Sequence, residues 1–342
     1  MSGLGQMPIG RDVRWSFTAD DHISGLAWSP DDARLAVCTS AGTLYVLDAH
    51  TGKSVCRWDA HEIGATAVDW GRGGLASCGQ DGKVKLWDAE AGKPLRSLDA
   101  GTAWVETLQW APGGGLLAST AGRKLRIWNP EGELIAEHCD FPSTIATICW
   151  RSDGKAIGVG YYGGVQLFRI GESEPYQNMV WKGSILTLAW SPNSRYVAAG
   201  SQEATVNFWK LPLRHGDELN MSGYATKVRE LSWDKGSRFL ATGGGEIITV
   251  WDVSGKGPAG TRPRQLEGHL RKVTHLHYQS HGLLLASADG DGYVALWNPA
   301  QSSQPLREGR VESAVSKAGW SHNDSAIAWG TTEGEVCVWT VG

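Results

Sequence analysis

The chain has 342 residues, of which 41% are apolar and 20% are charged, and it contains 45 glycines and 18 tryptophans. The apolar fraction is sufficient for a substantial core. Glycine-rich turns between short apolar runs favour many short strands over long helices. The formal net charge of −4 gives no general affinity for nucleic acids or for membrane surfaces.

The N-terminus has no basic stretch followed by an apolar core, and no window approaches the roughly 18 apolar residues of a membrane-spanning helix. Six cysteines are scattered singly, without a Cys-x-x-Cys pair. This distribution is typical of buried thiols in a reducing compartment and disfavours a disulfide framework or a zinc site. We therefore expect a soluble, cytoplasmic protein that needs no cofactor.

An apolar run that ends in an aromatic residue recurs eight times along the chain, at intervals of 40 to 45 residues. A second signature follows the end of each run after about 18 residues. It is an apolar residue, usually an aromatic residue, and then a polar residue, as in residues 86–88 around Trp87 and residues 296–298 around Trp297. A short middle strand and a glycine-bearing turn lie between the two. Repetition at this period indicates a repeat architecture. The aromatic residues that end the runs are Trp28, Trp70, Trp110, Trp150, Trp190, Trp233, Tyr278 and Trp320.

This pattern resembles the WD-repeat family, and the resemblance covers nearly the whole chain. It implies four-stranded blades arranged radially around a central channel, in one domain over residues 1–342. Each blade has two apolar faces that can be buried only against its neighbours, so the ring must close. We predict an all-β propeller of eight blades. A ring of seven blades with one additional repeat is the alternative.

The closure of the ring is also predicted. The chain ends directly after the third strand of the eighth repeat, which leaves the last blade without an outer strand. Residues 11–17 resemble an outer strand such as residues 54–58. We expect residues 11–17 to pair with the last blade and to cover its open edge.

Two repeats contain in full the polar tetrad of the WD-repeat family. The resemblance implies a buried chain of hydrogen bonds that runs from an indole N–H through a hydroxyl and an imidazole to a carboxylate. A hydrolase is disfavoured because no Gly-x-Ser-x-Gly motif is present and tryptophan is the remaining partner of the serine. The two tetrads are His61, Ser77, Asp81 and Trp87 in the second repeat, and His269, Ser287, Asp291 and Trp297 in the seventh.

A second hypothesis is a metal or small-ligand site in the channel. His275 and His277 would lie on one face of a strand, and Glu230 of the preceding repeat could join them. The spacing indicates no further ligand, so polar residues in contact with water are the simpler interpretation.

Candidate partner-binding residues lie in the loops that enter the blades. Trp104 occupies a loop position that holds small or polar residues in other repeats, where it could anchor a partner or pack over the channel mouth. Residues 205–275 contain 11 Lys and Arg against seven Asp and Glu. Within this segment, Lys227, Arg229, Arg271 and Lys272 lie in two adjacent entry loops. They could form a basic patch for an acidic partner, or simply a solvated face.

These features together favour a non-enzymatic scaffold or adaptor that binds a protein or peptide on the top face of the propeller. Nucleic-acid binding through the basic segment is disfavoured because the chain is acidic overall and lacks interleaved aromatic platforms.

Overall fold

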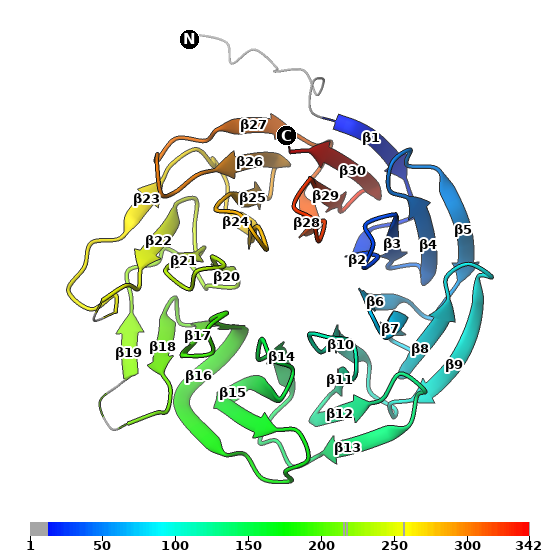
Figure 1. Cartoon of the computed structure of the whole chain (residues 1–342), viewed down its shortest axis with the longest axis horizontal. Helices are drawn as coiled ribbons and strands as arrows, with labels where there is room; N and C mark the ends of the chain where they lie inside the picture. Colours follow the sequence, from blue (N-terminus) through cyan, green and yellow to red (C-terminus); the bar gives the residue numbers. More distant parts are fainter. Residues whose placement is uncertain (1–12, 215, 217, 256, 342) are drawn as a thin grey trace.

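The computed structural model describes residues 13–214, 216, 218–255 and 257–341. These residues form 30 β-strands, which build antiparallel sheets arranged radially around a common centre (Figure 1). Within the described residues, no helix has the length and hydropathy needed to cross a membrane. All six cysteines are free.

Each repeat contributes strands in order from the centre of the ring outward. The innermost strands are β2 (Ile23–Trp28), β6 (Ala65–Gly71), β10 (Val105–Trp110), β14 (Ile145–Trp150), β20 (Leu231–Trp233), β24 (Val273–Tyr278) and β28 (Val315–Trp320). The second strands are β3 (Arg34–Thr39), β7 (Gly74–Gly79), β11 (Leu117–Ala121), β17 (Tyr196–Ser201), β21 (Phe239–Thr242), β25 (Leu285–Asp289) and β29 (Ala326–Thr331). The third strands are β4 (Thr43–Asp48), β8 (Lys83–Asp88), β12 (Lys124–Trp128), β18 (Val206–Lys210), β22 (Ile248–Asp252), β26 (Tyr293–Trp297) and β30 (Glu335–Thr340). The outer strands are β5 (Ser54–Asp59), β9 (Lys93–Asp99), β13 (Leu134–His138), β19 (Glu218–Met221), β23 (Arg264–Leu266), β27 (Arg307–Arg310) and β1 (Val13–Thr18).

The strands form seven hydrogen-bonded sheets, so the prediction of eight separate blades is wrong. Six sheets have four strands each, and the seventh has six strands, in the order β14-β15-β16-β17-β18-β19. Two strands of 14 residues, β15 (Ala156–Arg169) and β16 (Gln177–Trp190), fuse the fourth and fifth repeats into this sheet. The count of seven agrees with the alternative prediction, but no repeat is left over, because the fourth and fifth repeats share the six-stranded sheet.

The fusion arises where other repeats break the ladder at a turn. The first half of β16 pairs with β15, and its second half, from Ile185 onward, pairs with β17. On β15 the chain passes through Gly164, where an added Cβ atom would lie 2.1 Å from the carbonyl oxygen of Met179. Gly42 and Gly82 make the same close approach in repeats that are not fused, so the glycine serves the turn and does not cause the fusion. The pairing of Tyr162 with Ser184, beyond a shift in register, continues β15 and β16 through the segment.

Both faces of a sheet are apolar and buried, as β3 illustrates. Leu35 and Val37 pack in one cluster with Val338 of the last repeat, whereas Ala36 points into another cluster with Trp87 of the second repeat. Side chains alternate between the two faces of a strand, so one strand supplies both clusters. Each sheet is therefore stable only between two neighbours.

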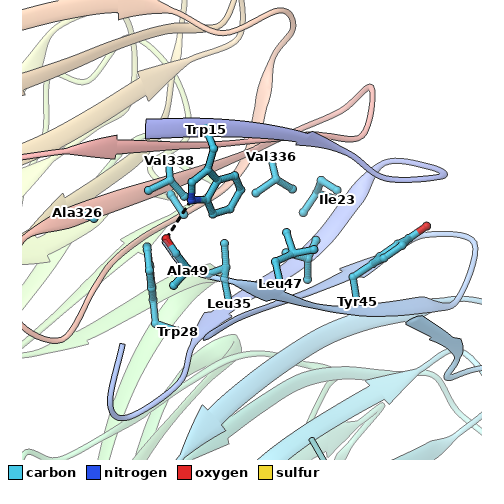
Figure 2. Packing of buried hydrophobic residues seen from close by; sticks show 12 residues of the cluster. Trp15, Ile23, Trp28, Leu35, Tyr45, Leu47, Ala49, Ala326, Val336 and Val338 are labelled. Atoms are coloured by element: carbon cyan, nitrogen blue, oxygen red, sulfur yellow. Dashed lines mark hydrogen bonds between the residues drawn. The ribbon is translucent and has the colours of Figure 1, made fainter. Parts of the chain in front are cut away.

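The N-terminal strand closes the ring. β1 pairs antiparallel with β30 and takes the outer position of the last sheet (Figure 1). Trp15 of β1 is 8% exposed and donates its indole N–H to the carbonyl oxygen of Ala49 at 2.9 Å, within the cluster between the first and last repeats (Figure 2). Residues 11 and 12 of the predicted strand lie outside the described residues.

Hydrogen bonds also cross the seam between the first and last repeats. The indole N–H of Trp28 donates to the carbonyl oxygen of Gly319 at 2.9 Å. In the turn that follows β2, the carboxylate of Asp32 accepts the backbone N–H groups of His322 at 2.7 Å and of Asn323 at 2.9 Å. These contacts join residues about 290 positions apart in the chain.

The Trp28 bond is one instance of a recurring link between neighbouring repeats. The indole N–H groups of Trp150, Trp233 and Trp320 each donate to the residue before the aromatic of the preceding repeat. The indole N–H of Trp110, by contrast, is buried without a partner. The backbone N–H of Trp110 instead donates to the carboxylate of Asp69 in the preceding repeat. The tryptophans are therefore packing residues that also hold neighbours in register.

This difference predicts a measurable stability contrast between two equally buried tryptophans. Trp28 and Trp110 are each 5% exposed. Trp28→Phe removes the bond to Gly319 and leaves a buried carbonyl unpaired, whereas Trp110→Phe removes an N–H that has no partner. We expect Trp28→Phe to lower the free energy of unfolding in urea by about 1–2 kcal/mol more than Trp110→Phe does. Equal losses would show that the seam bond contributes nothing.

Candidate interaction surface

The loop that enters each repeat and the turn between its second and third strands lie at the same end of the ring. Backbone hydrogen bonds join them, from the N–H of Ser40 to the oxygen of His22 at 2.9 Å and from the N–H of Gln80 to the oxygen of Gly64 at 2.9 Å. Equivalent bonds occur in further repeats, for example from Gln202 to Ser184. We call this end, formed by the entry loops and these turns, the top face.

Large apolar side chains are exposed on the top face. Burial of such groups is a main source of binding energy in protein interfaces. Their exposure to water is unfavourable in an isolated protein, so their presence on loops indicates an interaction surface. Of these side chains the sequence singles out only Trp104, because Trp104 differs from the small or polar residues at the same entry-loop position of the other repeats. A large apolar residue within any turn was the signal for the others. The five residues are Ile63 (62% exposed), Trp104 (54%), Tyr162 (63%), Ile247 (41%) and Leu270 (63%).

The predicted basic residues of the sixth and seventh repeats lie on the top face, but the side chains of two of them, Lys272 and Arg271, are engaged locally. The ammonium group of Lys272 donates to the carbonyl oxygen of Lys227 at 3.4 Å. Arg271 forms an exposed ion pair with Asp291 at 3.0 Å. Arg229 is exposed. The third repeat, which contains Trp104, lies across the ring, so the predicted residues do not form one continuous patch (Figure 1).

Glu230 lies close to the basic residues of this sector. Its side chain is buried behind the loop, with a residue exposure of 7%. Burial raises the pKa of Glu230, and the positive charge of Lys272 opposes that rise. Lys272 therefore compensates a buried carboxyl group and is less available to a partner.

The tetrad of the second repeat is a continuous buried network. Trp87 donates its indole N–H to the hydroxyl of Ser77 at 2.9 Å, and that hydroxyl lies 2.8 Å from Nε2 of His61. Nδ1 of His61 is 2.9 Å from the carboxylate of Asp81. Burial lowers the pKa of His61, and the nearby Asp81 only partly opposes this shift. In its neutral form the imidazole can accept a hydrogen bond from the Ser77 hydroxyl and donate one to the Asp81 carboxylate.

The seventh repeat builds the same network with a different acid, so the assignment of Asp291 is wrong. Nδ1 of His269 lies 3.0 Å from the carboxylate of Asp289, whereas Asp291 is exposed and pairs with Arg271. In the second repeat the position equivalent to Asp289 is Gly79, where an added Cβ atom would lie 2.6 Å from the imidazole of His61. Of the two repeats with a tetrad, only the seventh has a side chain at this position, and Asp289 is the carboxylate that contacts the histidine.

Asp289 also holds its own turn. Its carboxylate accepts the backbone N–H groups of Asp291 at 2.9 Å and of Tyr293 at 3.1 Å. Burial alone would raise the pKa of Asp289, but these bonds and the bond from His269 outweigh it and hold the pKa below its ordinary value. The remaining members of this network are Ser287, which lies 2.7 Å from Nε2 of His269, and Trp297, which donates to Ser287 at 2.8 Å.

These networks are unsuited to hydrolysis. Ser77 and Ser287 have no exposed surface, so a substrate cannot reach either hydroxyl. Each hydroxyl oxygen already accepts an indole N–H, which uses a lone pair that a nucleophile needs. The residues stabilise their sheets.

The channel histidines do not assemble a metal centre. The rings of His275 and His277 are 6.3 Å apart. Among the residues that the structure describes, no group of three or more His, Cys, Asp or Glu side chains is placed to hold a metal ion. His275 instead hydrogen-bonds the neighbouring Thr274 at 3.1 Å.

Comparison with known families identifies the repeats. The model of the WD domain, G-beta repeat, matches residues 92–129, 176–210 and 260–298. The model of the anaphase-promoting complex subunit 4 WD40 domain matches residues 12–73. The chain therefore belongs to the WD-repeat family, as the sequence predicted.

Individual relatives are distant. Protein FIZZY-RELATED 3 of Arabidopsis thaliana is 24% identical over 237 residues, which are 66% of this chain and 47% of that protein. WD repeat-containing protein slp1 of Schizosaccharomyces pombe is 20% identical over 225 residues, 64% of this chain and 45% of that protein. Anaphase-promoting complex subunit cdc20 of Dictyostelium discoideum is 25% identical over 235 residues, 66% of this chain and 46% of that protein. The chain thus aligns with about half the length of each.

A solved structure shows the same fold. The computationally designed Ika8 protein aligns with a TM-score of 0.84 and 22% sequence identity, over 97% of this chain and 100% of that one. At this identity the likeness establishes the fold alone.

The two aspartates of the seventh repeat allow a direct test of the site assignment. Asp289→Ala leaves His269 and two backbone N–H groups without a buried partner, and we expect it to cost about 2–4 kcal/mol of unfolding free energy. Asp291→Ala removes only an exposed ion pair and should change stability by less than about 1 kcal/mol. Urea unfolding of both variants measures the difference. A larger loss for Asp291→Ala would restore the original assignment.

Proposed function

We propose that this protein is a non-enzymatic adaptor that binds a protein or peptide partner on the top face of its propeller. The observation that carries this proposal is the set of five large apolar side chains exposed on the top-face loops. A soluble monomer gains nothing from exposing them, whereas an interface gains their burial. Trp104 is the strongest anchor among them, since tryptophan is enriched among residues that dominate binding energy.

Two further observations support the proposal. The Ser, His and Asp networks at Ser77 and Ser287 are inaccessible parts of the sheets, which removes the main basis for a catalytic role. One of the distant relatives is by name a subunit of the anaphase-promoting complex, so a WD-repeat protein of related sequence works within a multiprotein assembly. We extend only that general role, binding within an assembly, to this chain.

The proposal is tested by capture of partners from the native cell with tagged protein. Trp104→Ala and the double variant Arg229→Glu, Arg271→Glu change exposed residues of the top face and leave the core intact. Leu95→Ala is the matched control, because Leu95 is 55% exposed but lies on the outer strand β9. We expect at least one top-face variant to lose a partner that wild type and Leu95→Ala retain, with an affinity loss of about tenfold or more. Retention of every partner by both top-face variants would contradict the proposal.

A further inference from the structure

A cleft opens on the top face between the entry loops of the third and fourth repeats. Its volume is about 610 Å³. Its walls come from the entry loop at residues 100–103, the turn and strand start at residues 121–126, and residues 139 and 140. We call this the third-repeat cleft.

Positive charge predominates in the third-repeat cleft. Arg123, Lys124 and Arg126 line it together with a single carboxylate, that of Asp140. Glu137 pairs with Lys124 and Arg126, so three positive charges stand against two negative ones, an excess of one on a chain whose net charge is −4. A cleft of one sign attracts and orients a group of the opposite sign.

The cations of the cleft are held in place by the protein. The side chain of Arg126 is 9% exposed, with Nε 2.6 Å from a carboxylate oxygen of Glu137, and its guanidinium also donates to the carbonyl oxygen of Ala100. Nε of Arg123 donates to the carbonyl oxygen of Phe141. That bond uses only one of the guanidinium N–H groups of Arg123, which is exposed and can still bind an incoming carboxylate. Lys124 is also exposed, and its long ion pair with Glu137, at 3.8 Å, leaves ammonium N–H groups for a second carboxylate.

An apolar contact adjoins this charge. Trp104 follows Ala103 of the cleft wall directly, and its side chain is among the exposed apolar groups of the top face. Ala100, Ala103 and Ala121 add further apolar surface to the wall. A ligand that contacts both the cations of the cleft and Trp104 beside it combines a carboxylate with a neighbouring large apolar group.

We propose that the third-repeat cleft binds a partner segment in which Asp or Glu stands beside a large apolar residue. The carboxylate contacts Arg123 and Lys124, and the apolar side chain packs on Trp104. This inference rests on the proposed adaptor function and specifies the chemistry of the partner. The cleft is favoured over the basic residues of the sixth and seventh repeats because Trp104 adjoins it, and because the contact of Arg123 is a backbone carbonyl whereas Arg271 is paired with a carboxylate, that of Asp291.

The test uses a random peptide library selected on the whole protein, followed by fluorescence anisotropy with the enriched peptides. We expect the enriched sequences to pair an acidic residue with an aromatic or aliphatic one. Trp104→Ala and the double variant Arg123→Glu, Lys124→Glu should each weaken binding by about tenfold or more. Substitution of Asn or Gln for the acidic residue of the peptide should weaken it similarly, and binding should decline as salt is raised above about 0.15 M.

Matched controls separate a local effect from a general one. Lys93→Glu combined with Arg96→Glu makes the same change of charge on the exposed outer strand β9, and should leave binding unchanged. Circular dichroism and urea unfolding of every variant establish that the ring remains folded.

The outcomes distinguish this inference from the function on which it rests. Enriched peptides that are basic, or whose binding is lost only in the Arg229→Glu, Arg271→Glu variant, would overturn the cleft assignment and leave the adaptor function standing. Binding that both cleft variants retain at full strength would also overturn it. Failure of the adaptor function itself would appear in the native-cell experiment, as partners retained by every top-face variant.

Discussion

Leu35 and Ala36 are neighbours on one strand, yet they face opposite sheets and both are fully buried. Burial of both faces is the constraint on which the rest of the structure depends, because an end sheet of an open array would expose one apolar face to water. Closure removes this cost. Between the first and last repeats, which are not consecutive in the sequence, the ring is closed by the pairing of β1 with β30 and by the Trp28 and Asp32 hydrogen bonds.

The rigid ring in turn determines where binding can occur. Most strand residues are committed to packing, and even the polar His61 and His269 networks lie inside the sheets. Variation is tolerated in the loops that join the strands, which is where the exposed apolar residues and the third-repeat cleft lie. A stable frame with variable loops is the arrangement that a docking protein requires.

The repeat pattern was sufficient to predict the strands, because each Trp-ended run combines β-forming residues with a fixed place in the sheet. It did not predict the fusion of the fourth and fifth repeats, since the pairing of Tyr162 with Ser184 depends on how two backbone segments meet and not on hydrophobic pattern. The sequence predicted Asp291 because Asp291 follows Ser287 at the same distance along the chain as Asp81 follows Ser77. The contact of Asp289 with His269, and the lack of space for a side chain at Gly79, are visible only in three dimensions. Exposure of Trp104 and engagement of Lys272 likewise depend on neighbours from other segments.

Hydrogen exchange of a chain that begins at Asp20, and therefore lacks β1, tests the closure constraint most directly. If the ring depends on closure, amide protection should fall by at least about tenfold in the sheets on both sides of the seam, β28 to β30 and β2 to β5, relative to the whole chain. If protection is lost only at the edge of β30 that β1 covered, or is unchanged, the last sheet does not need its N-terminal strand. The account of a ring held together by closure would then be contradicted.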